Sequence, residues 1–204
     1  MTSDNVFNLS LIISITLTKK SLLRFSEDQD ESKSFIFPTI QPPSDHDYAD
    51  TSRGLASVSV GKGKVLKQPN WEVNPLSLVD GKGQTEPDSP KESVFLQRQD
   101  GTYGNLLIDL GQEIGIDMIN SYSWHQHQRL KDHKNRAKQV FTLYGLKDEE
   151  LPDLNLPANE TGWNRIVRVN SDRFFDVQED IDRPAQQACS IFASKGQIGR
   201  YRYL

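Results

Sequence analysis

Apolar and polar residues alternate in short runs along most of the chain. Near the N-terminus, the run NLSLIISITL (8–17) places leucine or isoleucine at every second position, with serine or threonine between most of them. A period of two is typical of a half-buried β-strand. The run is too short to cross a bilayer, which needs about 20 apolar residues, and the preceding MTSDN lacks the positive charge of a secretory signal. The pattern therefore predicts a strand.

Further short apolar runs follow, and Gly, Pro, Asn or Asp separates nearly every pair of them. No window keeps a helical period for three turns, and many short strands with turn residues between them indicate an all-β sandwich or barrel. FIFPTIQPPSD becomes proline-rich, which is typical of an edge strand that runs into a turn. The predicted strands are FIFPTIQPPSD (35–45), LASVSV (55–60), VFLQR (94–98), NLLIDL (105–110), IDMINSYSW (116–124), QVFTLYG (139–145), NRIVRV (164–169), QACSIFA (187–193) and YRYL (201–204).

Two of these runs carry apolar residues on both faces, which predicts central strands. In NLLIDLG, Leu106, Ile108 and Leu110 share one face, and Leu107 and Asp109 lie on the other. QVFTLYG repeats the pattern. Strands that are apolar on both faces are covered on both sides, so we expect the middle of the chain to form the core.

Length and charge narrow the class of protein. A chain of 204 residues suits one sizeable core better than two. With a net charge of −4, no basic face dominates the protein, so we do not expect it to bind nucleic acid. We interpret the one basic cluster, KDHKNRAK (131–138), as a solvated loop. The single cysteine, Cys189, excludes an internal disulfide and a cysteine-based zinc site. Its small and apolar neighbours predict a buried, inert thiol.

The segment NSYSWHQHQ (120–128) is where an apolar strand gives way to a basic stretch. His125 and His127, with His133, have the residue types of a three-histidine zinc site. The spacing also arises at ordinary strand ends, and Asp132 is the only nearby carboxylate to orient a ligand. We therefore interpret these histidines as polar contacts in a loop and not as metal ligands.

Signatures of catalysis are absent from the sequence. There is no G-x-S-x-G elbow, phosphate-binding loop or dinucleotide fingerprint. Adjacent acids such as Asp148 with Glu149 lie in polar loops, whereas glycoside hydrolysis needs two carboxyls at a set separation across a cleft.

Residue types that bind sugars gather around the same segment. Trp124 offers a flat apolar face on which a pyranose ring can stack. Hydrogen-bond donors to hydroxyl groups follow it in the chain: His125, His127, Arg129 and Arg136. Trp71 and Tyr103, both in turn-rich segments, are candidates for further stacking faces. The alternative is that Trp124 belongs to the core and the polar side chains are solvated.

A succession of motifs over residues 55–204 resembles a known group of domains. The motifs are NPLSLVDGKGQT (74–85), NLLIDLGQEIGIDMINSYSWH (105–125), RAKQVFTLYG (136–145), GWNRIVRVN (162–170) and GQIGRYRYL (196–204). Their order and spacing are similar to those of galactose-binding-domain-like β-sandwiches, the group of the discoidin and coagulation-factor C-type domains. The sequence departs from that pattern where EPDSPKES (86–93) replaces the tryptophan that usually follows the first motif, and residues 1–54 have no counterpart in it.

The resemblance implies an all-β jelly-roll β-sandwich of about eight strands, here with an additional N-terminal strand. It divides the chain into an N-terminal strand and polar linker (1–54), packed on the sandwich, and the sandwich itself (55–204). It also implies a structural calcium ion near the D-G turn, with Asp80 and Thr85 as its candidate ligands. An extracellular or cell-envelope location would follow, although no signal peptide is visible.

The function implied is a non-catalytic carbohydrate-binding or adhesive module, accessory to a carbohydrate-active or cell-surface system. Its partner would be a glycan or polysaccharide, with no nucleic acid and no membrane insertion. Two alternatives stay open: a glycoside hydrolase or a fragment of one, and a purely structural packing domain.

The end of the chain carries one more prediction. We expect residues 200–204 to pair beside a central strand, with Tyr201 and Tyr203 on one face. An unpaired edge would be open to other chains, so we expect the strand at 9–17 to cover it.

Overall fold

The computed structural model describes the greater part of the chain, and every structural statement below concerns that part. Within it the chain is mostly strand, with one α-helix of four residues, α1 (Ser171–Phe174), and short 3-10 helices such as η2 (Pro75–Val79) and η5 (Ala158–Glu160). The all-β prediction is confirmed. The described residues are 7–9, 12–16, 34–38, 47–50, 54–62, 64–65, 74–82, 94–97, 104–124, 135–147, 150–156, 158–178, 183, 186–193 and 196–204.

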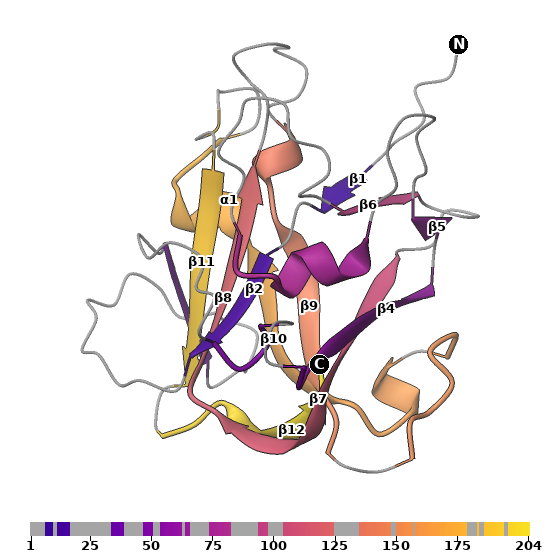
Figure 1. Ribbon diagram of the computed structural model, residues 1–204. Coiled ribbons are helices and arrows are strands. Elements are labelled where there is room, and N and C mark those ends of the chain that lie inside the picture. The colour runs from indigo at the N-terminus through magenta and orange to yellow at the C-terminus, as the bar shows by residue number, and fades with distance from the viewer. Residues whose placement is uncertain are drawn as a thin grey trace.

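A four-stranded antiparallel sheet forms one side of the molecule (Figure 1). Its order is β2-β8-β11-β3, so that β8 and β11 are central and two strands from the N-terminal part of the chain form its edges. The edge position expected for the run that begins at Phe35 is confirmed by β3. The strands are β2 (Ile12–Thr16), β8 (Met118–Trp124), β11 (Gln186–Ala193) and β3 (Ser34–Pro38).

A three-stranded antiparallel sheet has the order β12-β7-β4. Its strands are β12 (Gly199–Tyr203), β7 (Asn105–Ile116) and β4 (Ser57–Lys62). β7 is twice as long as the predicted run, because Gly111 adopts a positive φ of 78° and the strand continues through it. Only Asp117 separates β7 from β8, so one long ribbon passes from this sheet to the other (Figure 1).

Two smaller sheets complete the described strands. β9 (Val140–Gly145) pairs with β10 (Asn164–Asn170). The other small sheet is three-stranded and has the order β1-β6-β5, with β1 (Phe7–Leu9), β6 (Val94–Gln97) and β5 (Lys64–Val65).

One main hydrophobic core draws side chains from all the larger sheets. Ile119 and Ile191 come from the four-stranded sheet, Ile108 and Leu110 from the three-stranded sheet, and Val167 from β10. The two-faced pattern of NLLIDLG is confirmed, since Leu106 packs against this core while Leu107 lies in a second cluster. Cys189 is buried in the main core, and burial raises the pKa of its thiol to about 12, as expected of an inert cysteine.

The second cluster lies apart from the main core. Leu107, Leu146 and Tyr203 form it, and Leu154 and Trp163 pack against them. The segment after β9 therefore folds back over the three-stranded sheet, which gives the far side of β7 its own apolar cover.

The pairing of β12 corrects one prediction. β12 does pair beside the central strand β7, as expected, but Tyr201 packs against the main core and Tyr203 lies in the second cluster. Between the pairs Tyr201↔Ile114 and Tyr203↔Asp109, β12 advances by two residues and β7 by five, so the register shifts and the extra residues lie in β7. The regular alternation of faces along this strand pair is interrupted there, and the prediction that both tyrosines share a face is wrong.

The N-terminal strand also takes a different place from the one predicted. β2 pairs with β8, from Ile12↔Tyr122 to Thr16↔Met118, and β1 pairs with β6. The edge of β12 is instead met by Leu146, which bridges to Tyr203. Strand periodicity fixes which residues face the core but not which strand lies alongside, and this is why the partner was predicted wrongly. In the described part of the chain, no helix is long and apolar enough to span a membrane.

Candidate ligand-binding site

The predicted site lies at the end of the four-stranded sheet where β8 stops and β11 begins. Trp124, the last residue of β8, pairs with Gln186, the first of β11. α1 lies at this end too, and β12 lies at the opposite end of the molecule (Figure 1). After the gap in the described residues, 135–137 form a short 3-10 turn before β9.

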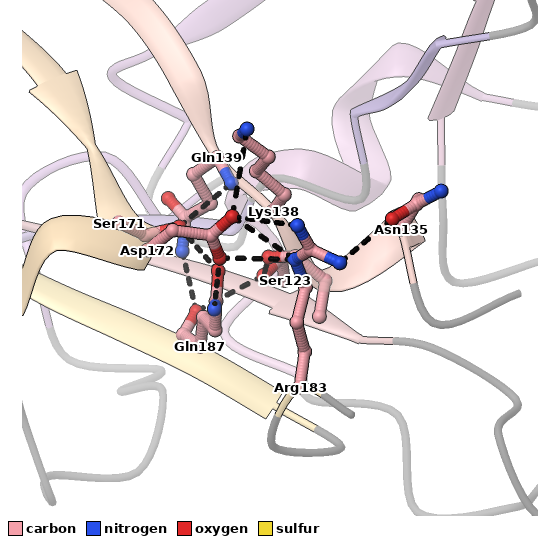
Figure 2. A network of polar contacts seen from close by, with 9 residues as sticks. Ser123, Asn135, Lys138, Gln139, Ser171, Asp172, Arg183 and Gln187 are labelled. Carbon is pink, nitrogen blue, oxygen red and sulfur yellow. Dashed lines mark hydrogen bonds and ion pairs between the residues drawn. The ribbon is translucent and has the colours of Figure 1, made fainter. Parts of the chain in front are cut away.

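A buried polar network lies beneath this end of the sheet. It consists of Ser123, Asn135, Lys138, Gln139, Ser171, Asp172, Arg183 and Gln187 (Figure 2).

Its centre is the pair formed by Asp172, in α1, and Arg183, just before β11. Arg183 Nε donates to both carboxylate oxygens at 3.1 and 3.0 Å, and a terminal nitrogen lies 2.9 Å from Oδ2. The other terminal nitrogen donates to Asn135 Oδ1 at 2.7 Å. One guanidinium group thus joins three separate segments of the chain, and its planar array of donors is suited to that task.

A chain of hydrogen bonds extends from this pair into the sheets. Gln187 Nε2 donates to Asp172 Oδ1 at 2.8 Å, and Gln187 Oε1 accepts from the hydroxyl group of Ser171. Ser171 Oγ in turn accepts from the backbone N–H of Gln139 at 2.8 Å. Each amide atom of Gln187 has a partner of opposite kind, so the network fixes the orientation of this side chain.

The same network closes the base of the loop that contains residues 124–136. Ser123 Oγ contacts the carbonyl oxygens of Ala137 and, at 3.1 Å, of Gln187. Gln139 Nε2 donates to the carbonyl groups of Ser121 and Gln187. Because Trp124 follows Ser123 and Arg136 precedes Ala137, these contacts hold the two ends of the loop against each other.

Two buried polar atoms near the network, Ser121 Oγ and Gln139 Oε1, have no hydrogen-bond partner in the described structure. A buried polar group without a partner costs about 1–3 kcal/mol. At this end of the sheet, polar side chains occupy the inward positions of the strands. Nearer the other end, Ile119 and Ile191 occupy the equivalent inward positions. This end of the core is therefore less stable than an apolar one would be.

The charge state of Asp172 is set by opposing effects. Burial alone would raise its pKa, but hydrogen bonds from Arg183 and Gln187 and the charges of Arg183 and Lys138 outweigh burial, and the pKa is lowered. Lys138 Nζ lies 3.5 Å from Oδ2, and its side chain is 33% exposed. The carboxylate is therefore ionised at neutral pH, and both of its oxygens are occupied by cationic or amide donors. A general base needs a free oxygen within reach of a substrate proton, so this arrangement favours holding the loop over catalysis.

Of the predicted ligand-binding residues, the structure describes Trp124 and Arg136. Trp124 is partly buried, and its indole nitrogen is enclosed with no acceptor among the described atoms. Its N–H edge therefore lies inside the protein, and the residue as a whole is only partly exposed. Arg136 is half-buried and takes part in an interaction of its own.

The other predicted site residues lie outside the described part of the chain: Trp71, Thr85, Tyr103, His125, His127 and Arg129. Asp80 is described, at the end of η2, where its Oδ1 accepts from the backbone N–H of Lys82 at 3.0 Å. Calcium takes six to eight oxygen ligands, and Asp80 is a single carboxylate. Across the described residues, no three His, Cys, Asp or Glu side chains are grouped closely enough to hold a metal ion.

Sequence reasoning missed the network itself. A signal was present, because Ser121 and Ser123 in β8 and Gln187 in β11 stand at the alternate positions that Ile119 and Ile191 occupy in the same strands. Polar residues at inward strand positions are uncommon and indicate a buried network. Asp172 and Arg183 gave no such signal, since they lie outside the strands.

Comparisons of the chain with protein-family models, with curated proteins and with solved structures found no match.

Proposed function

We propose that the chain is a galactose-binding-like jelly-roll sandwich that binds carbohydrate without catalysis, through the loop between β8 and β9. The resemblance of five successive motifs is one support for this proposal. The observation that carries it is the contact between Ser123 and the carbonyl group of Ala137, which holds together the two backbone segments that continue into Trp124 and Arg136.

An aromatic ring and a guanidinium group are both suited to binding a sugar. The exposed part of the indole can contact the C–H groups of a pyranose, and the guanidinium group can donate to its hydroxyl groups. Rigid support lowers the entropy lost when a ligand binds. The buried network supplies that support, because Arg183 holds Asn135 next to Arg136.

A non-catalytic role agrees with the state of the charged groups. Asp172 is the buried carboxylate nearest the loop base, and it is enclosed by Arg183, Gln187 and Lys138. Glycoside hydrolysis would need two carboxyl groups facing a sugar from opposite sides, and Asp172 is committed to the interior.

A glycan array probed with the whole chain, followed by titration calorimetry on the glycans it retains, tests this function. Trp124→Ala and Arg136→Ala should each weaken binding by about 1–3 kcal/mol, the usual cost of losing a central contact. Trp163→Phe and Arg200→Ala are matched controls, since Trp163 lies in the second cluster and Arg200 in an exposed ion pair with Glu113. Turnover of a polysaccharide by the purified chain, or failure to bind any glycan, would overturn the proposal.

A structural calcium ion at the turn after η2 is part of the same proposal and has a separate test. Asp80→Asn keeps an oxygen that can accept from Lys82 N–H but removes the charge that calcium requires. If the ion binds there, calcium should raise the melting temperature of the natural protein and not that of the variant. Equal responses would remove Asp80 from the site.

A further inference from the structure

Two leucine side chains are exposed on the connection between β9 and β10. Leu151 is 37% exposed and Leu156 is 54% exposed, the largest value among the large apolar residues of the described part of the chain. Both belong to one segment, 150–156, which the structure describes without a gap. A single exposed leucine is ordinary, but exposed apolar side chains with a polar rim mark a surface for a partner.

The segment is anchored to the three-stranded sheet between these two leucines. Leu154 packs in the second cluster, and Asn105 Nδ2, at the start of β7, donates to the carbonyl group of Leu154 at 3.1 Å. A Cβ atom built at Gly61, in β4, would lie 2.7 Å from Leu154 Cδ1, so the glycine admits this side chain. One leucine therefore anchors the segment, whereas Leu151 and Leu156 belong to none of the clusters of the described core.

Hydrogen bonds within the segment fix the backbone that carries Leu156. Asp153 Oδ1 accepts from the backbone N–H of Asn155 at 2.9 Å and from its Nδ2 at 2.8 Å. The backbone N–H of Leu156 donates to the carbonyl group of Asp153 at 3.1 Å. The surface is thus formed before any partner arrives, and a preformed surface loses less conformational entropy on binding.

Three carboxylates lie near these leucines in the chain. Glu150 directly precedes Leu151, Asp153 lies between the leucines, and Glu160 follows them in η5, on the same connection (Figure 1). All three residues are exposed, and within the described residues none of them takes part in an ion pair. Hydrogen bonds from the backbone and side chain of Asn155 lower the pKa of Asp153, so it is ionised at neutral pH. The rim of the apolar surface is therefore negative.

This charge selects the kind of partner that fits. Apolar side chains of a partner would contact the leucines, and the groups around them would face the carboxylates. A neutral or acidic partner would desolvate these carboxylates without compensation, whereas Lys and Arg form charge-assisted hydrogen bonds with them. A second copy of this chain carries a net charge of −4 and would be repelled.

We propose that Leu151 and Leu156, with the rim of Glu150, Asp153 and Glu160, bind a basic segment of a partner protein that combines Lys or Arg with large apolar side chains. We call these five residues the leucine surface.

The leucine surface is separate from the candidate ligand-binding site. Leu146, at the start of the same connection, bridges to Tyr203 in β12. β12 lies at the end of the molecule opposite α1 and the candidate site (Figure 1). The inference therefore does not depend on the proposed carbohydrate-binding function.

Selection of a phage-displayed library of random dodecapeptides against the whole chain tests the inference. We expect the selected peptides to be enriched, relative to the unselected library, both in Lys or Arg and in Leu, Ile or Phe. Their affinities would be measured with synthetic peptides by titration calorimetry. Binding should weaken as salt rises, because added ions screen the exposed charges.

Variants locate the binding on the protein. Leu151→Ser with Leu156→Ser should weaken it by about tenfold or more, the scale of losing an apolar anchor. Leu55→Ser with Leu76→Ser is the matched control, since these leucines are 40% and 37% exposed and lie outside the connection. The control should bind as tightly as the natural protein. The melting temperature of each variant shows whether it is folded.

Charge reversal tests the rim separately. Glu150→Lys with Glu160→Lys keeps both leucines and leaves Asp153, which holds the segment, unchanged. This variant should lose the basic peptides, and selection against it should return acidic peptides that keep their apolar residues.

Several outcomes would overturn the inference. They are the selection of no peptide, no enrichment in basic and apolar residues, equal affinity for the variant without the two leucines, and an equal loss in the control. Retention of basic peptides after charge reversal would exclude the rim. Equally tight binding of oligolysine would show an unspecific attraction for cations. Self-association that is seen by sedimentation and abolished by Leu151→Ser with Leu156→Ser would assign the surface to a second copy instead.

Discussion

Arg183 holds the carboxylate of Asp172 through three contacts of 2.9 to 3.1 Å, and both side chains are more than nine-tenths buried. Asp172 belongs to α1 at the end of β10, and Arg183 stands just before β11. The pair therefore joins two elements that the strand ladders do not connect, and Asn135 adds the start of β9 through the same guanidinium group.

Loss of one partner should cost far more than loss of an exposed pair. Arg183→Met leaves a carboxylate buried with only Gln187 and Lys138 beside it, and we expect a decrease of about 3–5 kcal/mol in the free energy of unfolding. Arg200→Met, which breaks an exposed pair with Glu113, should cost about 0–1 kcal/mol. Urea denaturation of both variants measures the difference. Equal costs would show that the buried pair does not hold this end of the fold together.

The same pair makes stability depend on pH in a defined direction. The pKa of Asp172 is lowered in the folded protein, because its hydrogen bonds and the neighbouring cations outweigh burial. The stabilisation is therefore fully present above the unfolded-state pKa of about 3.9 and is lost as pH falls through the lower folded-state value. The stability gap between the natural protein and Asp172→Asn should be constant from pH 7 to about pH 5 and should shrink below pH 4. A gap that stayed constant to pH 2 would contradict the assignment.

The ring of Tyr201 depends on the absence of a side chain at Gly145. A Cβ atom built at Gly145 would lie 2.6 Å from two ring carbons of Tyr201, well inside van der Waals contact. Gly145→Ala should therefore destabilise the fold by about 1–3 kcal/mol, as expected of overpacking. In a Tyr201→Leu background the same substitution should cost less, because the ring that clashes has gone. Equal costs in the two backgrounds, measured by thermal unfolding, would exclude this contact as the cause.

The positions of most strands along the chain follow from local sequence. Alternation in NLLIDLG placed Ile108 in the core and Leu107 on the opposite face, and the change to polar residues placed the end of β8 at Trp124. These predictions succeed because side chains alternate strictly along a strand, whatever its neighbours are. Turn residues between the runs gave the boundaries.

Pairing and burial of polar groups did not follow from local sequence. Tyr201 and Tyr203 lie in different apolar clusters because the register between β12 and β7 shifts between them, and a register shift has no period to detect. Asp172 and Arg183 meet only after α1 and β11 are in place, so that neither residue is distinguishable from a solvated charge beforehand. The candidate site at Trp124 and the basic stretch stays a prediction from the sequence, and the polar network beneath Trp124 could not be predicted.

The N-terminal strand supplies the last prediction, since it pairs with the strand that leads to the candidate site. Residues 12–16 of β2 pair with Met118–Tyr122 of β8. Deletion of residues 1–20 would leave that edge of β8 without its hydrogen-bond partners, and β8 is buried along almost its whole length. At about 0.5–1.5 kcal/mol net for each lost hydrogen bond, we expect a loss of at least about 2 kcal/mol. In a chain of this size such a loss lowers the melting temperature by about 4–8 °C.

The exposed edge should also promote association of the truncated protein, because unpaired strand edges pair with other chains. Light scattering and thermal unfolding measure the two effects. Deletion of residues 1–6, which removes no described strand, is the matched control.

If the longer deletion leaves the protein monomeric and as stable as the control, β2 contributes little to the sheet. The Ser123 contacts at the far end of β8 would then depend on β11 and β9 alone, and glycan binding by the truncated protein should be unchanged. If β2 does stabilise β8 as its pairing indicates, binding should weaken together with the melting temperature.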